Sequence, residues 1–358
     1  MHLLMGSVLV LALGVMACGE ASGPGGTGGD GGSAGVGGGG SPGLCVDNVC
    51  ACTEAGIRAA IAEGGGPFTF DCDGPMTVVT EATIEIDNDV ILDGEGNLTV
   101  DGDLAHRVFQ VAEGVTTALT GITVTEGAPI DRGGGGIRNY GTLTLTNTTV
   151  SGNTVSAVGS GITNEGTLTL TNTTVSGNTS ERDCGRNICG GAIANFGTLT
   201  MTNSTVSDNA NGGVWNLLDG IATIVSSTVT GDGDNIVQVG LNPALTVTNS
   251  LVTGCLHTSG TVSSGGHNID IESSGNTCGF DQPTDQVNVS ADDLKLGPLQ
   301  DNGGPTMTHA LGEGSVAIDQ IPAVDCVDAD GVPLTTDQRG EPRPGGTMCD
   351  VGAFEVQP

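Results

Sequence analysis

Apolar and polar residues alternate strictly along short stretches of the chain, and one such stretch recurs. The residues from Gly141 to Thr154 are repeated letter for letter from Gly166 to Thr179, and a third copy runs from Gly197 to Ala210. Alternation with a period of two predicts β-strands. A repeat of about 25 residues predicts a solenoid of stacked coils.

Aligned copy by copy, the apolar positions expected to face inward form columns. These columns are Ile137, Ile162, Ile193 and Val214; Leu143, Leu168, Leu199, Ala222 and Leu245; Leu145, Leu170, Met201, Ile224 and Val247; and Val150, Val175, Val206, Val229 and Val252. A polar column (Asn147, Asn172, Asn203, Ser226 and Asn249) falls at the bend between two strands, where Asn tolerates left-handed backbone. We therefore predict an all-β fold: a right-handed parallel β-helix with three short strands per coil over residues 75–295.

The composition favours this narrow coil over a conventional globular core. The 358 residues include 63 Gly but only one Trp, one Tyr and six Phe, so small side chains must fill the interior. The 41 acidic residues outnumber the nine basic ones, and the net charge is −32. Such a charge repels nucleic acid and anionic membrane surfaces, so no nucleic-acid partner is expected.

The first 43 residues predict export. Residues 1–17 contain an apolar run that is too short to span a membrane, and they are interpreted as a signal peptide. The segment Val15-Met-Ala-Cys18 resembles the lipobox of bacterial lipoproteins, which implies lipidation (palmitate) at Cys18 and a membrane partner through that lipid; plain secretion is the alternative. The Gly-rich residues 18–43 predict a flexible tether. The expected location is the cell surface, anchored in the outer membrane.

Residues 44–74 predict a cap over the open end of the β-helix. Thr53 can cap a short helix from Glu54 to Glu63, with Ile57, Ala60 and Ile61 on its apolar face. The stretch from Cys52 to Ile61 resembles the Cys-Ser-Leu-Arg-Glu-Ala-Ile segment that opens many secreted bacterial β-helix proteins.

The cysteines predict disulfides in an oxidising compartment. With Cys18 acylated, ten of the eleven remain, enough for five bridges. Short spacings favour Cys184–Cys189, Cys255–Cys278 and Cys326–Cys349. The pairing among Cys45, Cys50, Cys52 and Cys72 is open. A zinc site at Cys50 and Cys52 lacks a second ligand pair at the usual spacing.

Two further resemblances cover most of the chain. Gly190-Gly-Ala-Ile-Ala-Asn195 and Ser204-Thr-Val-Ser-Asp-Asn209 are similar to repeats of polymorphic outer membrane proteins, over about residues 114–256. Residues 296–358, with Leu296-Gly-Pro-Leu, Gly314-Ser-Val-Ala-Ile-Asp319, Thr336-Asp-Gln-Arg-Gly340 and Cys349-Asp-Val-Gly-Ala-Phe-Glu355, resemble the C-terminal module of choice-of-anchor Q domain proteins. This resemblance implies an exported bacterial β-helix protein held at the surface. We expect residues 296–358 to form an irregular, disulfide-linked C-terminal cap.

Candidate catalytic residues are sparse. A β-helix polysaccharide lyase or hydrolase needs paired carboxylates or a base beside acids, and the candidates are Asp101, Asp103, Asp131, Arg132 and Arg138. The preferred interpretation is that the Asp-Gly pairs are turns and Arg138 a solvated loop residue, so no catalytic residue is predicted.

Metal-binding and ion-pair motifs are equally limited. Asp325, Asp328 and Asp330 before Gly331 resemble a calcium loop, but Cys326 and Ala329 interrupt the ligand spacing. No cofactor or metal is therefore expected, with a structural calcium as the alternative. Gly265-Gly-His-Asn268 predicts a turn. Asp337, Arg339 and Arg343 predict an ion-paired clasp within the C-terminal cap.

Threonines form the most regular outward surface. One column is Thr144, Thr169, Thr200, Thr223 and Thr246, and the next is Thr146, Thr171, Thr202 and Thr248, interrupted by Val225. Coils about 4.8 Å apart and alternate residues about 6.7 Å apart make this a flat lattice. The expected function is a non-catalytic structural or adhesive surface module that meets glycans or other cells. The alternatives are a polysaccharide-cleaving enzyme and ice or flat-lattice binding by the threonines.

Overall fold

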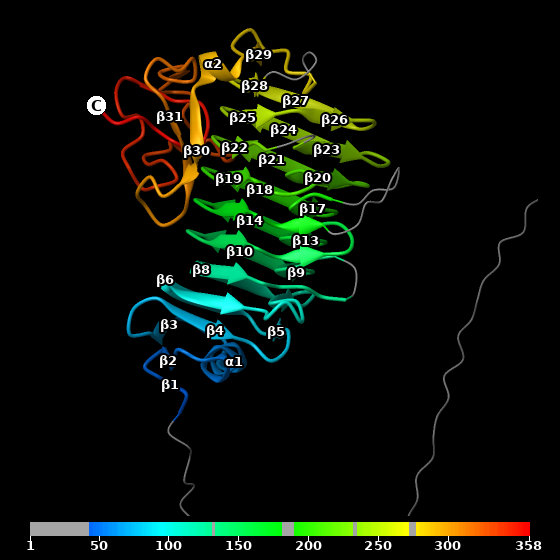
Figure 1. Cartoon of the computed structure of the whole chain (residues 1–358), viewed down its shortest axis with the longest axis vertical. Helices are drawn as coiled ribbons and strands as arrows, with labels where there is room; N and C mark the ends of the chain where they lie inside the picture. Colours follow the sequence, from blue (N-terminus) through cyan, green and yellow to red (C-terminus); the bar gives the residue numbers. More distant parts are fainter. Residues whose placement is uncertain (1–42, 131–132, 181–189, 232–234, 272–276) are drawn as a thin grey trace, which may run out of the picture. The chain divides into compact units, whose positions relative to one another are not determined.

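The described residues after position 42 form a cylinder of stacked parallel β-coils (Figure 1). The structure is a computed structural model, and it describes residues 43–130, 133–180, 190–231, 235–271 and 277–358. The helices among these residues are α1 (Glu54–Glu63) and α2 (Ala291–Leu294). The predicted all-β parallel β-helix, with three strands in each regular coil, is confirmed.

Equivalent strands of successive coils form three faces. The first face contains β3 (Gly65–Asp71), the first part of β6 (Val90–Asp101) and of β8 (Thr116–Thr125), β10 (Thr142–Thr146), β14 (Thr167–Thr171), β18 (Thr198–Thr202), β21 (Ile221–Val225), β24 (Ala244–Thr248) and β27 (Thr261–Gly266). The second face contains β4 (Met76–Val79), the last part of β6 and of β8, β11 (Thr149–Ser151), β15 (Thr174–Ser176), β19 (Thr205–Ser207), β22 (Thr228–Val229), β25 (Leu251–Thr253), β28 (Ile269–Ile271) and β29 (Gln286–Val289). The third face contains β5 (Ile84–Ile86), β7 (Phe109–Val111), β9 (Ile137–Asn139), β13 (Ile162–Asn164), β17 (Ile193–Asn195), β20 (Val214–Leu217), β23 (Ile236–Val239) and β26 (Cys255–His257).

Short pairs complete the strand set. They are β1 (Cys45–Val46) with β2 (Val49–Ala51), β12 (Thr154–Val155) with β16 (Thr179–Ser180), β30 (Leu296–Gln300) with β31 (Thr308–Leu311), and β32 (Ile321–Pro322) with β33 (Met348–Cys349). All but β12–β16 are antiparallel. The antiparallel pairs therefore lie before the regular coils or in the segment that follows them.

The predicted apolar columns form the core. Leu143 pairs with Leu168, and Leu168 with Leu199, in parallel register. Each of these leucines is fully buried. Repetition of one side chain at one position thus builds a continuous interior that needs few aromatic residues.

The polar corner column has the predicted left-handed backbone. Asn147 and Asn172 both have a φ of 51°, and Ser226 has a φ of 46°. Asn172 Nδ2 donates to Asn147 Oδ1 at 3.2 Å. Gly121, with a φ of 58°, takes the same corner one coil earlier. The corners therefore turn the chain between the first and second faces.

Two buried asparagine ladders inside the coils were not predicted. Asn139 Nδ2 donates to Asn164 Oδ1 at 2.7 Å, and Asn164 Nδ2 donates to Asn195 Oδ1 at 2.7 Å. Asn195 continues the ladder to Asn216 at 2.8 Å. The second ladder is Asn153, Asn178 and Asn209. Their signal was in the sequence, because Asn recurs two residues after the Ile column and after each Val-Ser pair.

The N-terminal end is closed as predicted by α1. Thr53 Oγ1 accepts from Gly56 N at 3.2 Å, and Ile57, Ala60 and Ile61 are buried. Strand β3 already pairs in parallel with β6. The coil stacking therefore begins within the segment that the sequence assigns to the cap.

Residues 296–358 do not simply close the far end of the cylinder. They fold back along the second face, beside β25, β22 and β19 (Figure 1). Their apolar residues form a small core of their own with Leu251, Ile269 and Ile271. The C-terminal segment thus packs laterally over several coils.

Candidate functional site

The predicted threonine lattice lies on the first face. Thr144, Thr169 and Thr200 pair in register, and the column continues through Thr223 to Thr246. The neighbouring column Thr146, Thr171, Thr202, Val225 and Thr248 has the same register. Thr202 is only 8% exposed, because it adjoins Asn203, whose side chain binds the C-terminal segment. The predicted face is therefore partly covered.

A third column on this face was missed. Thr142, Thr167 and Thr198 pair in register and are exposed, before Ile221 ends the run. Each is the first Thr of a Thr-Leu-Thr-Leu-Thr or Thr-Leu-Thr-Met-Thr strand. The accessible lattice is therefore three residues wide over two coils, because Thr202 is covered in the third.

The second face carries a longer threonine column that sequence reasoning also missed. Its members, one per coil in parallel register, are Thr77, Thr99, Thr123, Thr149, Thr174, Thr205 and Thr228. The first four are at least partly exposed, and the last three are buried beneath the C-terminal segment. The column is therefore divided into an open half and a covered half.

Hydrogen bonds hold the C-terminal segment on the covered half. Thr174 Oγ1 donates to the carbonyl of Met307 at 2.6 Å, and Thr205 Oγ1 donates to Gln338 Oε1 at 2.6 Å. Thr228 Oγ1 accepts from Ala353 N at 3.2 Å. The threonine hydroxyls thus bind the amide and carbonyl groups of a chain that crosses the coils.

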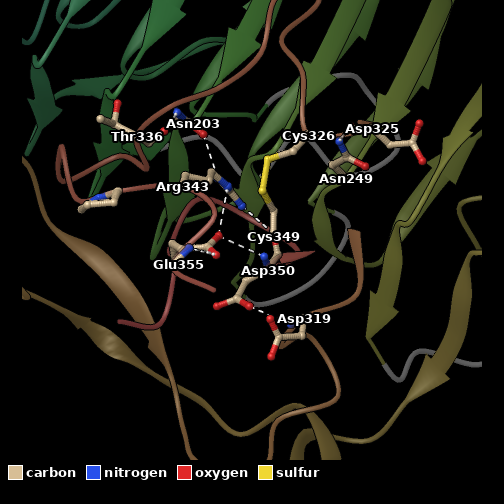
Figure 2. Close-up of a disulfide and its surroundings, with 12 residues drawn as sticks. Asn203, Asn249, Asp319, Asp325, Cys326, Thr336, Arg343, Cys349, Asp350 and Glu355 are labelled. Atoms are coloured by element: carbon tan, nitrogen blue, oxygen red, sulfur yellow. Dashed lines mark hydrogen bonds and ion pairs between the residues drawn. A yellow bond between two sulfur atoms is a disulfide. The ribbon is translucent and has the colours of Figure 1, made fainter. Parts of the chain in front are cut away.

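Arg343 anchors this segment from within (Figure 2). Its side chain is fully buried, and it donates to Asn203 Oδ1 at 2.9 Å and to the carbonyl of Gly352 at 2.7 Å. Its Nε lies 3.2 Å from Glu355 Oε2, a charge contact whose geometry falls short of a hydrogen bond. Burial raises the pKa of Glu355, and the charge of Arg343 opposes that shift.

The predicted clasp is therefore only partly as expected. Arg339 pairs with Asp337 at 2.7 Å, within the segment. Arg343 instead pairs with Glu355 and reaches the corner residue Asn203 of the β-helix. The clasp joins the segment to the coils because the Arg343 side chain is long enough to reach that corner.

A serine–histidine pair also lies under the segment. His309 Nδ1 is 2.7 Å from the carbonyl of Gly297, which can only accept, so Nδ1 carries the proton and Nε2 accepts from Ser207 Oγ at 2.7 Å. Burial lowers the pKa of His309, which keeps the ring neutral. Ser207 is fully buried, so the pair holds the segment and does not face a substrate.

A groove of about 540 Å³ lies where the covered half meets the open half. One wall is the second face, with Thr123, Thr149 and Thr174 in one column and Ser151 and Ser176 in the next. The other wall is the loop around Asp301 and residues 304–307. Six of the twelve residues that line the groove carry a hydroxyl group, and Asp301 places one carboxylate at its edge.

The candidate catalytic residues that the structure describes do not form one site. Asp101 lies at the end of β6 on the second face, and its Oδ1 accepts from Asp103 N at 2.7 Å in a turn. Arg138 lies on the third face, where it pairs with Glu165 at 2.7 Å and stacks over Tyr140. Asp131 and Arg132 lie outside the described residues. The preferred interpretation of Asp101 as a turn residue fits this geometry, and Arg138 proves to be an ion-paired strand residue, not a loop residue.

The calcium-like motif is folded as a turn. Asp328 Oδ1 accepts from Asp330 N and from Val332 N, both at 2.9 Å. Asp325 Oδ2 lies 3.8 Å from His267 Nε2. In the described part of the chain, no three His, Cys, Asp or Glu side chains are grouped so that they could hold a metal ion.

Disulfides lie at both ends of the β-helix and within the C-terminal segment. Cys255–Cys278 and Cys326–Cys349 are paired as the spacing predicts. The open pairing resolves as Cys45–Cys50 and Cys52–Cys72. Cys18, Cys184 and Cys189 lie outside the described residues. Over the described ranges, no helix is long and apolar enough to cross a membrane.

Comparison with known proteins supports the architecture. The sequence matches no family model and no curated protein. Among solved structures, the crystal structure of pectate lyase Pel9A is similar, with a TM-score of 0.52 over 84% of this chain and 91% of that chain. The likeness is one of fold. At 14% sequence identity it shows a shared parallel β-helix.

Proposed function

We propose that the protein is an exported, surface-anchored β-helix that acts as a non-catalytic binding or adhesive module. The observation that carries the proposal is the distribution of side chains on the faces. Hydroxyl groups repeat in register over many coils, whereas Asp101 and Arg138 lie on different faces and are engaged in a turn and an ion pair. A repeating hydroxyl surface suits a long ligand that crosses several coils.

Bond-cleavage assays test the non-catalytic role. The purified protein, offered acidic and neutral polysaccharides with and without calcium, is expected to release no product. Cleavage that disappears in Asp101→Ala or Arg138→Ala would overturn the proposal and favour a polysaccharide lyase or hydrolase. Binding without cleavage would support it.

The anchor is a separate part of the proposal. The lipobox-like segment before Cys18 and the resemblance of residues 296–358 to choice-of-anchor Q domains support a lipoprotein held at the outer membrane. Labelled palmitate is expected to enter the wild type and not Cys18→Ala. Equal labelling of both proteins would leave plain secretion.

A second candidate function is binding to ice or another flat lattice. It is favoured by the in-register threonine columns of the first face, which place hydroxyls about 4.8 Å apart along the axis. Thermal hysteresis that is lost in Thr169→Tyr and kept in Thr149→Val, on the second face, would support it. No hysteresis in the wild type would remove it.

A further inference from the structure

We propose that the open half of the second-face threonine column binds an extended polypeptide segment with basic side chains. This docking strip consists of Thr77, Thr99, Thr123 and Thr149, which pair in register across four coils. The inference rests on the proposed binding function and names the partner. It follows from what occupies the rest of the same column.

The covered half shows which chemistry the column binds. Its three threonines hold a backbone carbonyl, a side-chain amide oxygen and a backbone N–H of the C-terminal segment. Each hydroxyl can both donate and accept, so the same column serves either group of a peptide. A ligand on the open half would meet the same hydroxyls.

The groove marks the start of the open half. The loop around Thr306 and Met307 overhangs Thr174, which is fully buried, while Thr149 in the next coil is partly exposed. The groove of about 540 Å³ lies at this boundary between the buried Thr174 and the partly exposed Thr149. A second polypeptide could therefore enter the groove and continue along the strip, beyond the edge of the surface that the C-terminal segment covers.

The acidic side chains beside the strip favour a ligand with basic side chains. Asp301 is exposed on the groove wall. Asp101 lies in the column next to the strip, where it pairs in register with Thr125, which in turn pairs with Ser151. Glu126 borders the same edge, where its Oε1 would lie 3.2 Å from a Cβ added at Gly152. The nearby Arg339 is paired with Asp337 and does not neutralise these groups.

Neither a second copy of this chain nor its own N-terminal residues suit the strip as the ligand. Two copies, each with a net charge of −32, repel one another, and residues 1–42 contain no Lys or Arg. A separate polypeptide that offers amide groups and positive charge fits the strip better. Neutral glycans share the hydroxyl chemistry but gain nothing from the carboxylates.

Fluorescence anisotropy with a labelled decapeptide of five Gln-Lys repeats tests the inference on the full chain. We expect saturable one-to-one binding at about 0.15 M salt, where long-range attraction is largely screened. Thr149→Val and Thr123→Val, which keep the shape and remove a hydroxyl, should each weaken binding about fivefold. Thr144→Val, on the first face, is the matched control and should leave the affinity unchanged.

Two results would overturn the inference. Equal affinities for wild type, Thr149→Val and Thr123→Val would show that the peptide adheres only through net charge. Displacement of the peptide by a neutral oligosaccharide that itself binds more tightly would assign the strip to a glycan. Neither result bears on bond cleavage, so the non-catalytic role is tested independently.

Discussion

Buried polar side chains are unusually regular in this core. Asn164 is fully buried, accepts from Asn139, and donates to Asn195 Oδ1 and to the carbonyls of Thr198 and Gly166. A buried amide is tolerated only when its hydrogen bonds are made. The ladder supplies those bonds by repetition, since each Asn is the partner of the next.

Asn164→Ala is therefore expected to destabilise the protein strongly. It leaves buried partners unsatisfied on both sides, and the free energy of unfolding should fall by about 3 kcal/mol. Urea unfolding followed by circular dichroism measures the change. Thr167→Ala, at an exposed position in the following strand, should cost less than about 0.5 kcal/mol. Similar losses in both variants would contradict the role of the ladder.

We expect His309 to make the attachment of the C-terminal segment sensitive to pH. Burial is the main cause that lowers the pKa of His309, and the Gly297 carbonyl and the charge of Asp208 oppose it. The unfolded chain takes up a proton near pH 6.5, whereas the folded chain does so only at lower pH. The stabilisation is present above about pH 6.5 and is lost as pH falls.

The urea concentration at the unfolding midpoint should accordingly decrease as the pH is lowered from about 7.5 to about 5.5. It should decrease less steeply in His309→Gln. Burial raises the pKa values of Asp350 and Glu355, which act in the opposite sense at acidic pH. Both groups are present in both proteins, so the difference between the two curves isolates the histidine. Parallel curves would show that His309 does not titrate on unfolding.

At the scale of elements, the C-terminal segment is attached by long-range contacts to successive coils, among them Thr174, Asn203 and Asn249. Arg343 joins it to Asn203, and Asn249 Nδ2 donates to the carbonyl of Asp325 at 2.8 Å (Figure 2). The corner asparagines therefore have two roles: they turn the coil and they bind the segment. At Asn172 the two contacts are divided: its side chain bonds to Asn147 in the adjacent coil, and its backbone carbonyl accepts from Thr306 Oγ1 of the segment at 3.0 Å.

Arg343→Ala should release the segment. It leaves the buried carboxylate of Glu355 without its opposite charge, which typically costs about 3–5 kcal/mol. Limited proteolysis should then cleave within residues 296–358 faster than in the wild type. In Arg343→Met with Glu355→Gln, the Glu355 charge is removed together with the guanidinium, and cleavage should be slower than in Arg343→Ala. Unchanged cleavage in Arg343→Ala would mean that the other contacts suffice.

The whole molecule carries far more negative than positive charge. With a net charge of −32 on one chain, mutual repulsion opposes the compact state. Disulfides at both ends and in the C-terminal segment counter this by limiting the unfolded chain. The stability of the cylinder should therefore depend on ionic strength.

The melting temperature is expected to rise by several degrees as sodium chloride increases from about 0.01 M to 0.3 M, because the Debye length falls from about 30 Å to below 8 Å. Differential scanning calorimetry at constant pH measures the shift. An equal concentration of an uncharged osmolyte is the control for general solvent effects. A melting temperature that does not change with salt would contradict repulsion as a major term.

The sequence alone determined the repeating part of the molecule. In a parallel β-helix each residue contacts its equivalent in the next coil, so a period of about 25 residues directly implies the columns of Leu143, Leu168 and Leu199 and the Asn147 corner. The asparagine ladders were equally readable, since they follow the same period. Local spacing also implied two disulfides and the capped helix at Thr53.

Only the tertiary structure decided where the non-repeating parts lie. The contacts of Arg343 with Asn203 and of Gln338 with Thr205 join residues more than 100 positions apart, and no period relates them. The faces of Asp101 and Arg138 likewise depend on where each coil turns. The C-terminal segment covers one half of a threonine column and leaves the other half open, because its packing depends on side-chain shape and charge and not on a repeated pattern.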